Sequence, residues 1–122
     1  MTPISLGLDT FGDVSVGPDG QPQSMDRVLR EVLDQATLAD EIGIDFIGLG
    51  EHHRPDFAIS SPEIVLAAIA GRTKRIKLGT GILILPQRNP LVVAKELATL
   101  DAFTNGRVLL GTGVGWLKEE FD

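Results

Sequence analysis

Short apolar runs alternate along the chain with longer amphipathic segments. Four apolar runs have the length and composition of buried strands: residues 4–11, 45–50, 75–85 and 107–114. Three segments between them have helical spacing or a helix start signal: residues 24–42, 61–73 and 89–106. This order predicts parallel strands with helices packed outside them.

Capping residues mark the expected ends of the helices. Ser24 stands where the first helix begins and Gly43 where it ends, and these residue types favour those positions. Ser61-Pro62-Glu63 and Asn89-Pro90 each place a proline in a first helical turn, where its missing N–H does no harm. Residues 116–122 predict the beginning of a fourth helix.

A five-residue repeat occurs within the last two predicted strands. Leu78-Gly79-Thr80-Gly81-Ile82 is matched by Leu110-Gly111-Thr112-Gly113-Val114. The period, about 30 residues, is one strand-plus-helix unit, as in a (β/α)8 barrel or an open doubly wound sheet. About four strands cannot close an eight-stranded barrel. Because open strand edges and a bare apolar face promote association, we expect an incomplete barrel over residues 1–122 or an oligomer.

Composition narrows the class of protein. The formal net charge is −6, which argues against binding to nucleic acid because that needs a basic surface. The chain has no cysteine, so disulfides, thiolate catalysis and Cys-ligated metals are excluded. No apolar run approaches the roughly 18 residues that span a bilayer, and no signal peptide is visible. A cytoplasmic protein is therefore expected.

Polar residues that handle protons follow the second predicted strand. Glu51-His52-His53 contains both histidines of the chain. Ligands of parallel α/β proteins bind beyond the carboxyl ends of the strands, so these three residues are candidate catalytic groups. Glu51 and His53 should share one side and His52 the other. A purely structural role stays open. Metal binding is disfavoured because adjacent histidines chelate one ion poorly and no H-E-x-x-H pattern occurs.

Glycines cluster toward the carboxyl ends of the third and fourth predicted strands. The run Gly111-Thr112-Gly113-Val114-Gly115 has the spacing G-x-G-x-G, which is a weak match to the dinucleotide fingerprint G-x-G-x-x-G. Glycine at a strand end lets a flat ligand approach the backbone closely. Packing between tapering strands is an equally good explanation of these glycines.

Several of these motifs together resemble the bacterial luciferase-like monooxygenase family. The run 46–53, then 61–63 and 79–82, and finally Leu100-Asp101 before 105–107 carry the resemblance, which covers nearly all of the chain. It implies that the chain is the N-terminal portion of a longer (β/α)8 barrel. It also implies reduced FMN, or the related deazaflavin coenzyme, at the carboxyl ends of the strands.

The resemblance assigns cofactor contacts to two glycine segments. Gly81 and Ile82 match a bulge where the family often has a non-prolyl cis peptide behind the flavin ring. Gly113, Val114 and Gly115 match the end of the fourth strand near the flavin. We therefore expect these five residues to bind the cofactor.

The resemblance assigns further roles to residues after the first two strands. Asp9, Thr10 and Phe11 match the end of the first strand, which lines the substrate pocket. Glu51-His52-His53 matches the family's acid-His-His motif, in which the middle histidine borders the flavin.

The implied activity is that of a flavin-dependent monooxygenase, in which reduced flavin and oxygen oxidise a small organic substrate. A deazaflavin-dependent hydride-transfer enzyme is the alternative, since residues 86–90 and 113–117 look more like that branch of the family than residues 1–69 do. A non-catalytic half-barrel that self-associates is the third possibility. The expected partners are a small substrate and a second copy of the chain or the rest of the barrel, with no nucleic acid or membrane.

Overall fold

The structure is a computed structural model and describes residues 2–121. Its larger sheet holds four parallel strands, in the order β1 (Gly7–Thr10), β2 (Phe46–Leu49), β3 (Lys77–Thr80) and β5 (Val108–Leu109). A second parallel pair continues it, formed by β4 (Leu83–Ile84) and β6 (Thr112–Gly113). The helices are α1 (Met25–Ile42), α2 (Pro62–Ala70) and α3 (Pro90–Phe103), with 3-10 turns η1 (Leu85–Gln87) and η2 (Lys118–Glu120).

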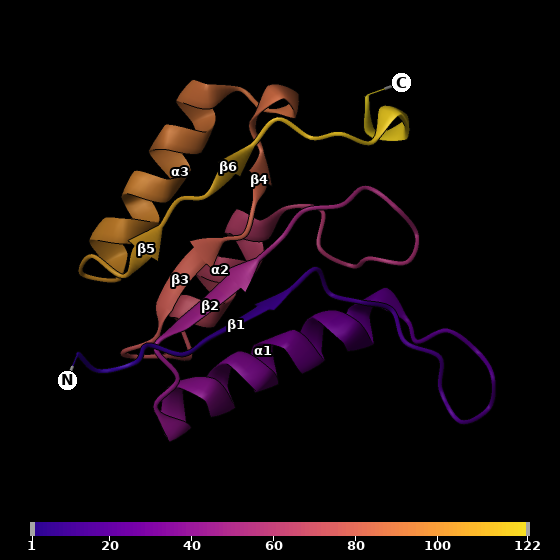
Figure 1. The fold of residues 1–122 in the computed structure, drawn as a ribbon, viewed down its shortest axis with the longest axis horizontal. Helices are drawn as coiled ribbons and strands as arrows, with labels where there is room; N and C mark the ends of the chain where they lie inside the picture. Colours follow the sequence, from indigo (N-terminus) through magenta and orange to yellow (C-terminus); the bar gives the residue numbers. More distant parts are fainter. Residues whose placement is uncertain (1, 122) are drawn as a thin grey trace.

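The strands of the larger sheet lie side by side in chain order. Right-handed crossovers that always step in the same direction place every connecting helix on the same face of the sheet. Figure 1 shows this arrangement, with α1 beside β1, α2 behind β2 and β3, and α3 beside β5 and β6. A doubly wound sheet would instead reverse its strand order. The described residues therefore form a partial (β/α) barrel, and the predicted fold class is confirmed.

The core lies between the sheet and the helices. Alternate residues of the central strands point into it, and the fully buried ones include Leu49, Leu78 and Ile47. They pack against α1 and α2, through the buried side chains of Val32, Ala36, Ala39, Leu66 and Ile69. Each fully buried Leu or Ile stabilises the fold by about 1.5–3 kcal/mol. This packing fixes the strands on which the candidate site stands.

On the opposite face of the sheet, the aromatic ring of Phe46 lies over three glycines. A Cβ atom on Gly79 would overlap the Phe46 ring, and Cβ atoms on Gly7 and Gly48 would lie 2.9 and 3.0 Å from it. The ring thus extends from β2 over β1 and β3, and only glycine leaves it room. For Gly79, packing therefore explains the glycine that the repeat places there.

The strands are shorter than the apolar runs predicted. The first begins at Gly7 rather than Ile4, because β1 is the edge of the sheet and, among residues 2–121, only Asp45 pairs with the segment before it, through Leu6. The predicted strand 75–85 breaks into β3 and β4 on either side of Gly81 and Ile82. The strand 107–114 breaks in parallel into β5 and β6, since the two runs pair with each other.

The second helix ends at Ala70, before the predicted Thr73. The chain at its end is held by a buried guanidinium group, because Arg107 donates to the carbonyl oxygens of Ala70, the last helical residue, and of Thr73 beyond it, at 3.3 and 3.2 Å. The predicted fourth helix is only the single turn η2, and Asp122 lies outside the described residues.

Candidate functional site

The carboxyl ends of the first three strands lie at one edge of the sheet. The register places Thr10 opposite Leu49, and Leu49 opposite Thr80. The ladder continues one step beyond, where the Gly50 N–H donates to the Thr10 carbonyl and the Gly81 N–H donates to the Leu49 carbonyl, both at 2.9 Å. We call this edge the rim; it comprises residues 9–11, 50–53, 81–84 and 111–115. The acidic-histidine motif and the glycine segment therefore meet there, as predicted.

Asp9 and Phe11 lie on the open face of the rim, above glycines of the neighbouring strands. A Cβ on Gly50 would overlap the Phe11 ring, and a Cβ on Gly81 would lie 2.8 Å from Asp9 Oδ1. Desolvation by the surrounding backbone raises the pKa of Asp9 above its ordinary value of 3.8. Asp9 thus adjoins the predicted cofactor segment, and Phe11 lies over Gly50 at the end of the neighbouring strand.

Thr10 points to the other side of the strand. Its hydroxyl oxygen accepts the Gly12 N–H at 3.0 Å, and it lines a polar hollow of about 210 Å³ with Glu31 and Gln35 of α1. Because side chains alternate along a strand, Thr10 is not brought together with the other two predicted pocket residues.

The peptide bond between Gly81 and Ile82 is cis, as the resemblance implied. The Ile82 side chain is 39% exposed and lies over Gly113, where a Cβ would overlap it. Val114 follows with 77% of its surface exposed. Gly115 has a φ of 72° and lies against the side chains of Ile84 and Phe121. At this part of the rim, the free surface is that of Ile82 and Val114 rather than bare glycine backbone.

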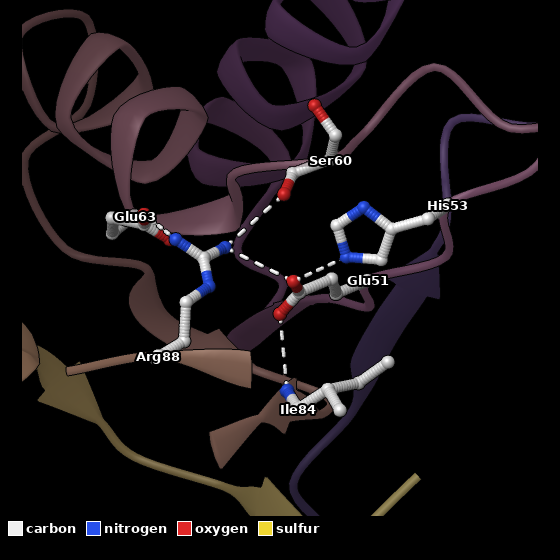
Figure 2. Close-up of polar contacts among 6 residues, drawn as sticks. All are labelled: Glu51, His53, Ser60, Glu63, Ile84 and Arg88. Carbon is white, nitrogen blue, oxygen red and sulfur yellow. Dashed lines mark hydrogen bonds and ion pairs between the residues drawn. The ribbon is translucent and has the colours of Figure 1, made fainter. Parts of the chain in front are cut away.

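Glu51 is buried, with 2% of its surface exposed, and both of its carboxylate oxygens accept hydrogen bonds (Figure 2). Oε1 lies 2.6 Å from His53 Nε2 and 3.1 Å from Arg88 Nη2. Oε2 accepts the backbone N–H of Ile84 at 3.0 Å. Since a carboxylate only accepts hydrogen bonds, Nε2 of His53 carries the hydrogen of this contact.

Arg88 extends this network to the beginning of α2. Its Nη1 donates to Glu63 Oε1 at 2.7 Å, and its Nη2 also donates to the Ser60 carbonyl at 3.1 Å (Figure 2). Burial alone would lower the pKa of Arg88, but the negative charges of Glu51 and Glu63 outweigh it and raise the pKa. Arg88 therefore stays charged between two carboxylates.

His52 points away from this network, as the alternation predicted. Its ring lies 4.8 Å from the Phe11 ring and 5.0 Å from the Phe57 ring, centroid to centroid. Phe57 belongs to the loop between β2 and α2, so aromatic rings from two connections flank the imidazole. This arrangement orients His52 on the same side of the rim as Phe11.

The family profile described as luciferase-like monooxygenase matches residues 9–122. The chain belongs to the luciferase-like monooxygenase family. Membership agrees with the parallel strands, the shared rim and the acid-His-His motif, all of which occur in the matched residues.

Individual relatives in the luciferase-like family align with most of this chain. Limonene 1,2-monooxygenase of Rhodococcus erythropolis is 36% identical over 118 residues, which are 92% of this chain and 30% of that protein. An F420-dependent glucose-6-phosphate dehydrogenase of Nocardia farcinica is 39% identical over 95 residues, which are 70% of this chain and 27% of that protein. The chain thus spans less than a third of the length of these relatives.

A solved structure of the same kind superposes closely. The oxygenating constituent of 3,6-diketocamphane monooxygenase from Pseudomonas putida, a type II Baeyer-Villiger monooxygenase in complex with FMN, matches with a TM-score of 0.87 and 28% identity. The alignment covers 97% of this chain and 31% of that one. The described residues therefore have the architecture of part of a luciferase-like barrel.

Arg88 and Phe57 were not singled out as site residues from the sequence. Arg88 entered only as a member of the segment 86–90, and Phe57 lies in a loop without a recognisable motif. One signal could have found Arg88, because parallel strands bring the chain after β3 beside the Glu51 that follows β2.

Two further classes of site are absent from the described part of the chain. Among residues 2–121, no group of three His, Cys, Asp or Glu side chains is placed to hold a metal ion. No helix there combines the length and the apolar character that crossing a membrane requires.

Proposed function

We propose that this member of the luciferase-like family is a flavin-dependent monooxygenase that acts on a small organic substrate. The observation that carries the proposal is the meeting of His52, Phe11 and Asp9 with the Gly81–Ile82 segment at one rim. A flat ring needs an apolar platform and few polar groups to orient it, and this rim offers both.

The residues present fit a flavin ring. Ile82 and Val114 present exposed apolar side chains, and Gly81 keeps a side chain out of the space beside Asp9. Gly113 and Gly115 support this platform indirectly, since their missing side chains admit Ile82 and Ile84. When bound, reduced FMN would supply two electrons to molecular oxygen, so that one oxygen atom enters the substrate and the other leaves as water.

The remaining rim residues would orient the substrate and exclude water. His52, held between two phenylalanine rings, can donate a hydrogen bond or move a proton at the edge of the flavin ring. Phe11 and Phe57 form an apolar wall beside it. The raised pKa of Asp9 favours a carboxyl group that can hold a proton at a higher pH than usual. The FMN complex of the Pseudomonas relative supports the choice of cofactor.

The test uses the protein at its natural full length. Reduced FMN and oxygen are supplied, and the oxygenated product of candidate organic substrates is followed with and without the protein, because free reduced FMN consumes oxygen by itself. We expect FMN to bind and product to form only in the presence of the protein, and His52→Ala to lower product formation strongly. A protein that binds no FMN and forms no oxygenated product would contradict the proposal.

A deazaflavin-dependent hydride-transfer enzyme is the second candidate. The F420-dependent dehydrogenase of Nocardia farcinica supports it, and so does the likeness of residues 86–90 and 113–117 to that branch. In the same assay such an enzyme would reduce or oxidise deazaflavin without consuming oxygen. Binding of deazaflavin in preference to FMN would favour this second function.

A further inference from the structure

We infer that Glu51 and Arg88 are positioning residues, which hold the flavin platform and the histidine motif in place and do not exchange protons with the substrate. The inference rests on the proposed function, because it concerns the same rim. It differs from the expectation that Glu51 acts as a catalytic group.

The Glu51 carboxylate has no open side. It is almost completely buried, and its two oxygens already accept hydrogen bonds from His53, Arg88 and Ile84. A general acid or base must lie within hydrogen-bond reach of the proton that it transfers. A carboxylate enclosed by three donors instead fixes those donors relative to one another.

Glu51 also connects the two segments that carry the proposed flavin contacts. Ile84 lies two residues after Ile82, so the hydrogen bond from its N–H fixes the chain directly beyond the Gly81–Ile82 segment. His53 adjoins His52 in the sequence. Through one side chain, the segment after β2 is thus tied to the segment after β3, and these two segments carry the proposed flavin contacts.

Arg88 extends the network from Glu51 to the beginning of α2. Its guanidinium group joins Glu51 and the Ser60 carbonyl, which lie near the two ends of the β2–α2 connection, to Glu63 in the first turn of α2. A planar guanidinium group can donate to several acceptors in fixed directions, whereas a lysine ammonium cannot reproduce that fork. Arg88 therefore sets the distance between the loop before α2 and the chain after β4.

The experiment measures FMN affinity and local opening in the natural full-length protein. The variants are Glu51→Gln, which keeps the size, and Arg88→Lys, which keeps the charge. Each should weaken FMN binding on the order of tenfold in a fluorescence titration. In Glu51→Gln the Ile84 amide should also exchange its hydrogen faster, while the Leu78 amide in β3, which donates to the Arg107 carbonyl, keeps its rate.

The matched control is Arg107→Lys. Arg107 is another buried arginine with several acceptors, but it lies at the amino ends of the strands, where it contacts Thr73, Ile76 and Ala70. This variant should lose thermal stability like Arg88→Lys and yet bind FMN as the wild type does. The double variant Glu51→Gln/Arg88→Lys should bind FMN about as weakly as either single variant, because both changes break one network.

The possible results separate the two claims. If Glu51→Gln and Arg88→Lys lower stability but leave FMN affinity unchanged, the network serves only the fold and the inference is wrong. If Glu51→Gln does not fold, Arg88→Lys decides by the same criterion. If the wild type binds no FMN, the proposed function fails and the inference fails with it, before any variant is compared.

Discussion

Gly50 shows how strictly single positions of the rim are determined. A Cβ at this buried position would overlap the Phe11 ring and lie 2.8 Å from the Gly81 carbonyl oxygen. The ring could turn, but the oxygen belongs to a residue whose own N–H is bonded to the Leu49 carbonyl, so it cannot move freely. The glycine is therefore required by close packing, independently of any ligand.

We predict that Gly50→Ala lowers the free energy of unfolding by about 1–3 kcal/mol, the usual result of overpacking. Urea denaturation measures the change. Gly71→Ala is the control, since Gly71 has a φ of −68° and its nearest neighbour would be 3.6 Å from the new Cβ. That substitution should stabilise the chain by about 0.4–1 kcal/mol. A Gly50→Ala variant as stable as the wild type would refute the packing argument.

The histidine motif was partly predictable from residues alone. Strand alternation correctly separated His52 from Glu51 and His53, and the position after a parallel strand correctly placed all three at the rim. Thr10 obeys the same alternation, so its side chain lies apart from those of Asp9 and Phe11, with which the predicted substrate pocket had grouped it. The partners of these residues were not predictable, because Arg88 and Phe57 reach them through register and loop conformation, which no local pattern encodes.

At the scale of elements, the helix caps differ in strength although their residue types look equally good. The Asn89 side chain accepts the N–H groups of Leu91 and Val92 at 3.0 and 3.4 Å, whereas Ser24 makes no side-chain capping bond to α1. The predicted start of both helices is right, but only one cap satisfies free N–H groups.

We predict that Asn89→Ala costs about 1 kcal/mol in the free energy of unfolding, the typical value for a lost N-cap. Ser24→Ala should change it by less than about 0.5 kcal/mol, because no capping bond is lost. Both variants are compared with the wild type by urea denaturation. Equal losses in the two variants would show that the side-chain geometry at Asn89 does not matter.

Asp40 connects α1 to the beginning of β3. Its carboxylate accepts the backbone N–H groups of Lys74, Arg75 and Ile76 at 2.7–2.9 Å. Burial alone would raise the pKa of Asp40, but these hydrogen bonds and the charge of Arg75 outweigh it and lower the pKa below 3.8. The charged form is therefore favoured in the folded state.

This shift gives the stability a direction with pH. A lowered folded-state pKa means that the carboxylate contributes fully above about pH 4 and that its contribution is lost as the pH falls through the lowered value. Asp40→Asn should therefore be less stable than the wild type at pH values near 7, and the difference should narrow at about pH 3. Asp34→Asn, which changes an exposed ion pair with Arg72, should show little difference at either pH. A gap for Asp40→Asn that does not depend on pH would contradict this account.

The breaks within the third and fourth predicted strands were beyond sequence reasoning. After Lys77 and after Arg107, the two apolar runs continue without a charged residue or proline, so their pattern predicts unbroken strands. The interruption lies where the Gly111 carbonyl oxygen accepts hydrogen bonds from both the Thr80 hydroxyl and the Leu83 N–H. Such constraints are set between strands and have no signature within either one.

At the scale of the whole molecule, the described chain leaves its sheet open at both edges. β1 is the first strand and β5 the last, and apolar side chains near them are exposed, among them Leu6, Leu8, Leu109 and Leu110. The face that carries Phe46 has no covering layer in the described residues. That residues 1–122 form the N-terminal part of a barrel domain stays a prediction.

Open edges of this kind are templates for pairing with other strands. We predict that the isolated 122-residue chain associates, so that its mass in solution exceeds the 13.1 kDa of one copy. We also predict that this chain holds FMN only weakly, because the platform at Ile82 and Val114 has no opposite wall among the described residues. Light scattering after gel filtration gives the mass, and titration with FMN gives the affinity. A stable, folded monomer that binds FMN with a micromolar or lower dissociation constant would show that the open sheet is sufficient by itself, and that neither a second copy nor further strands are needed to complete the site.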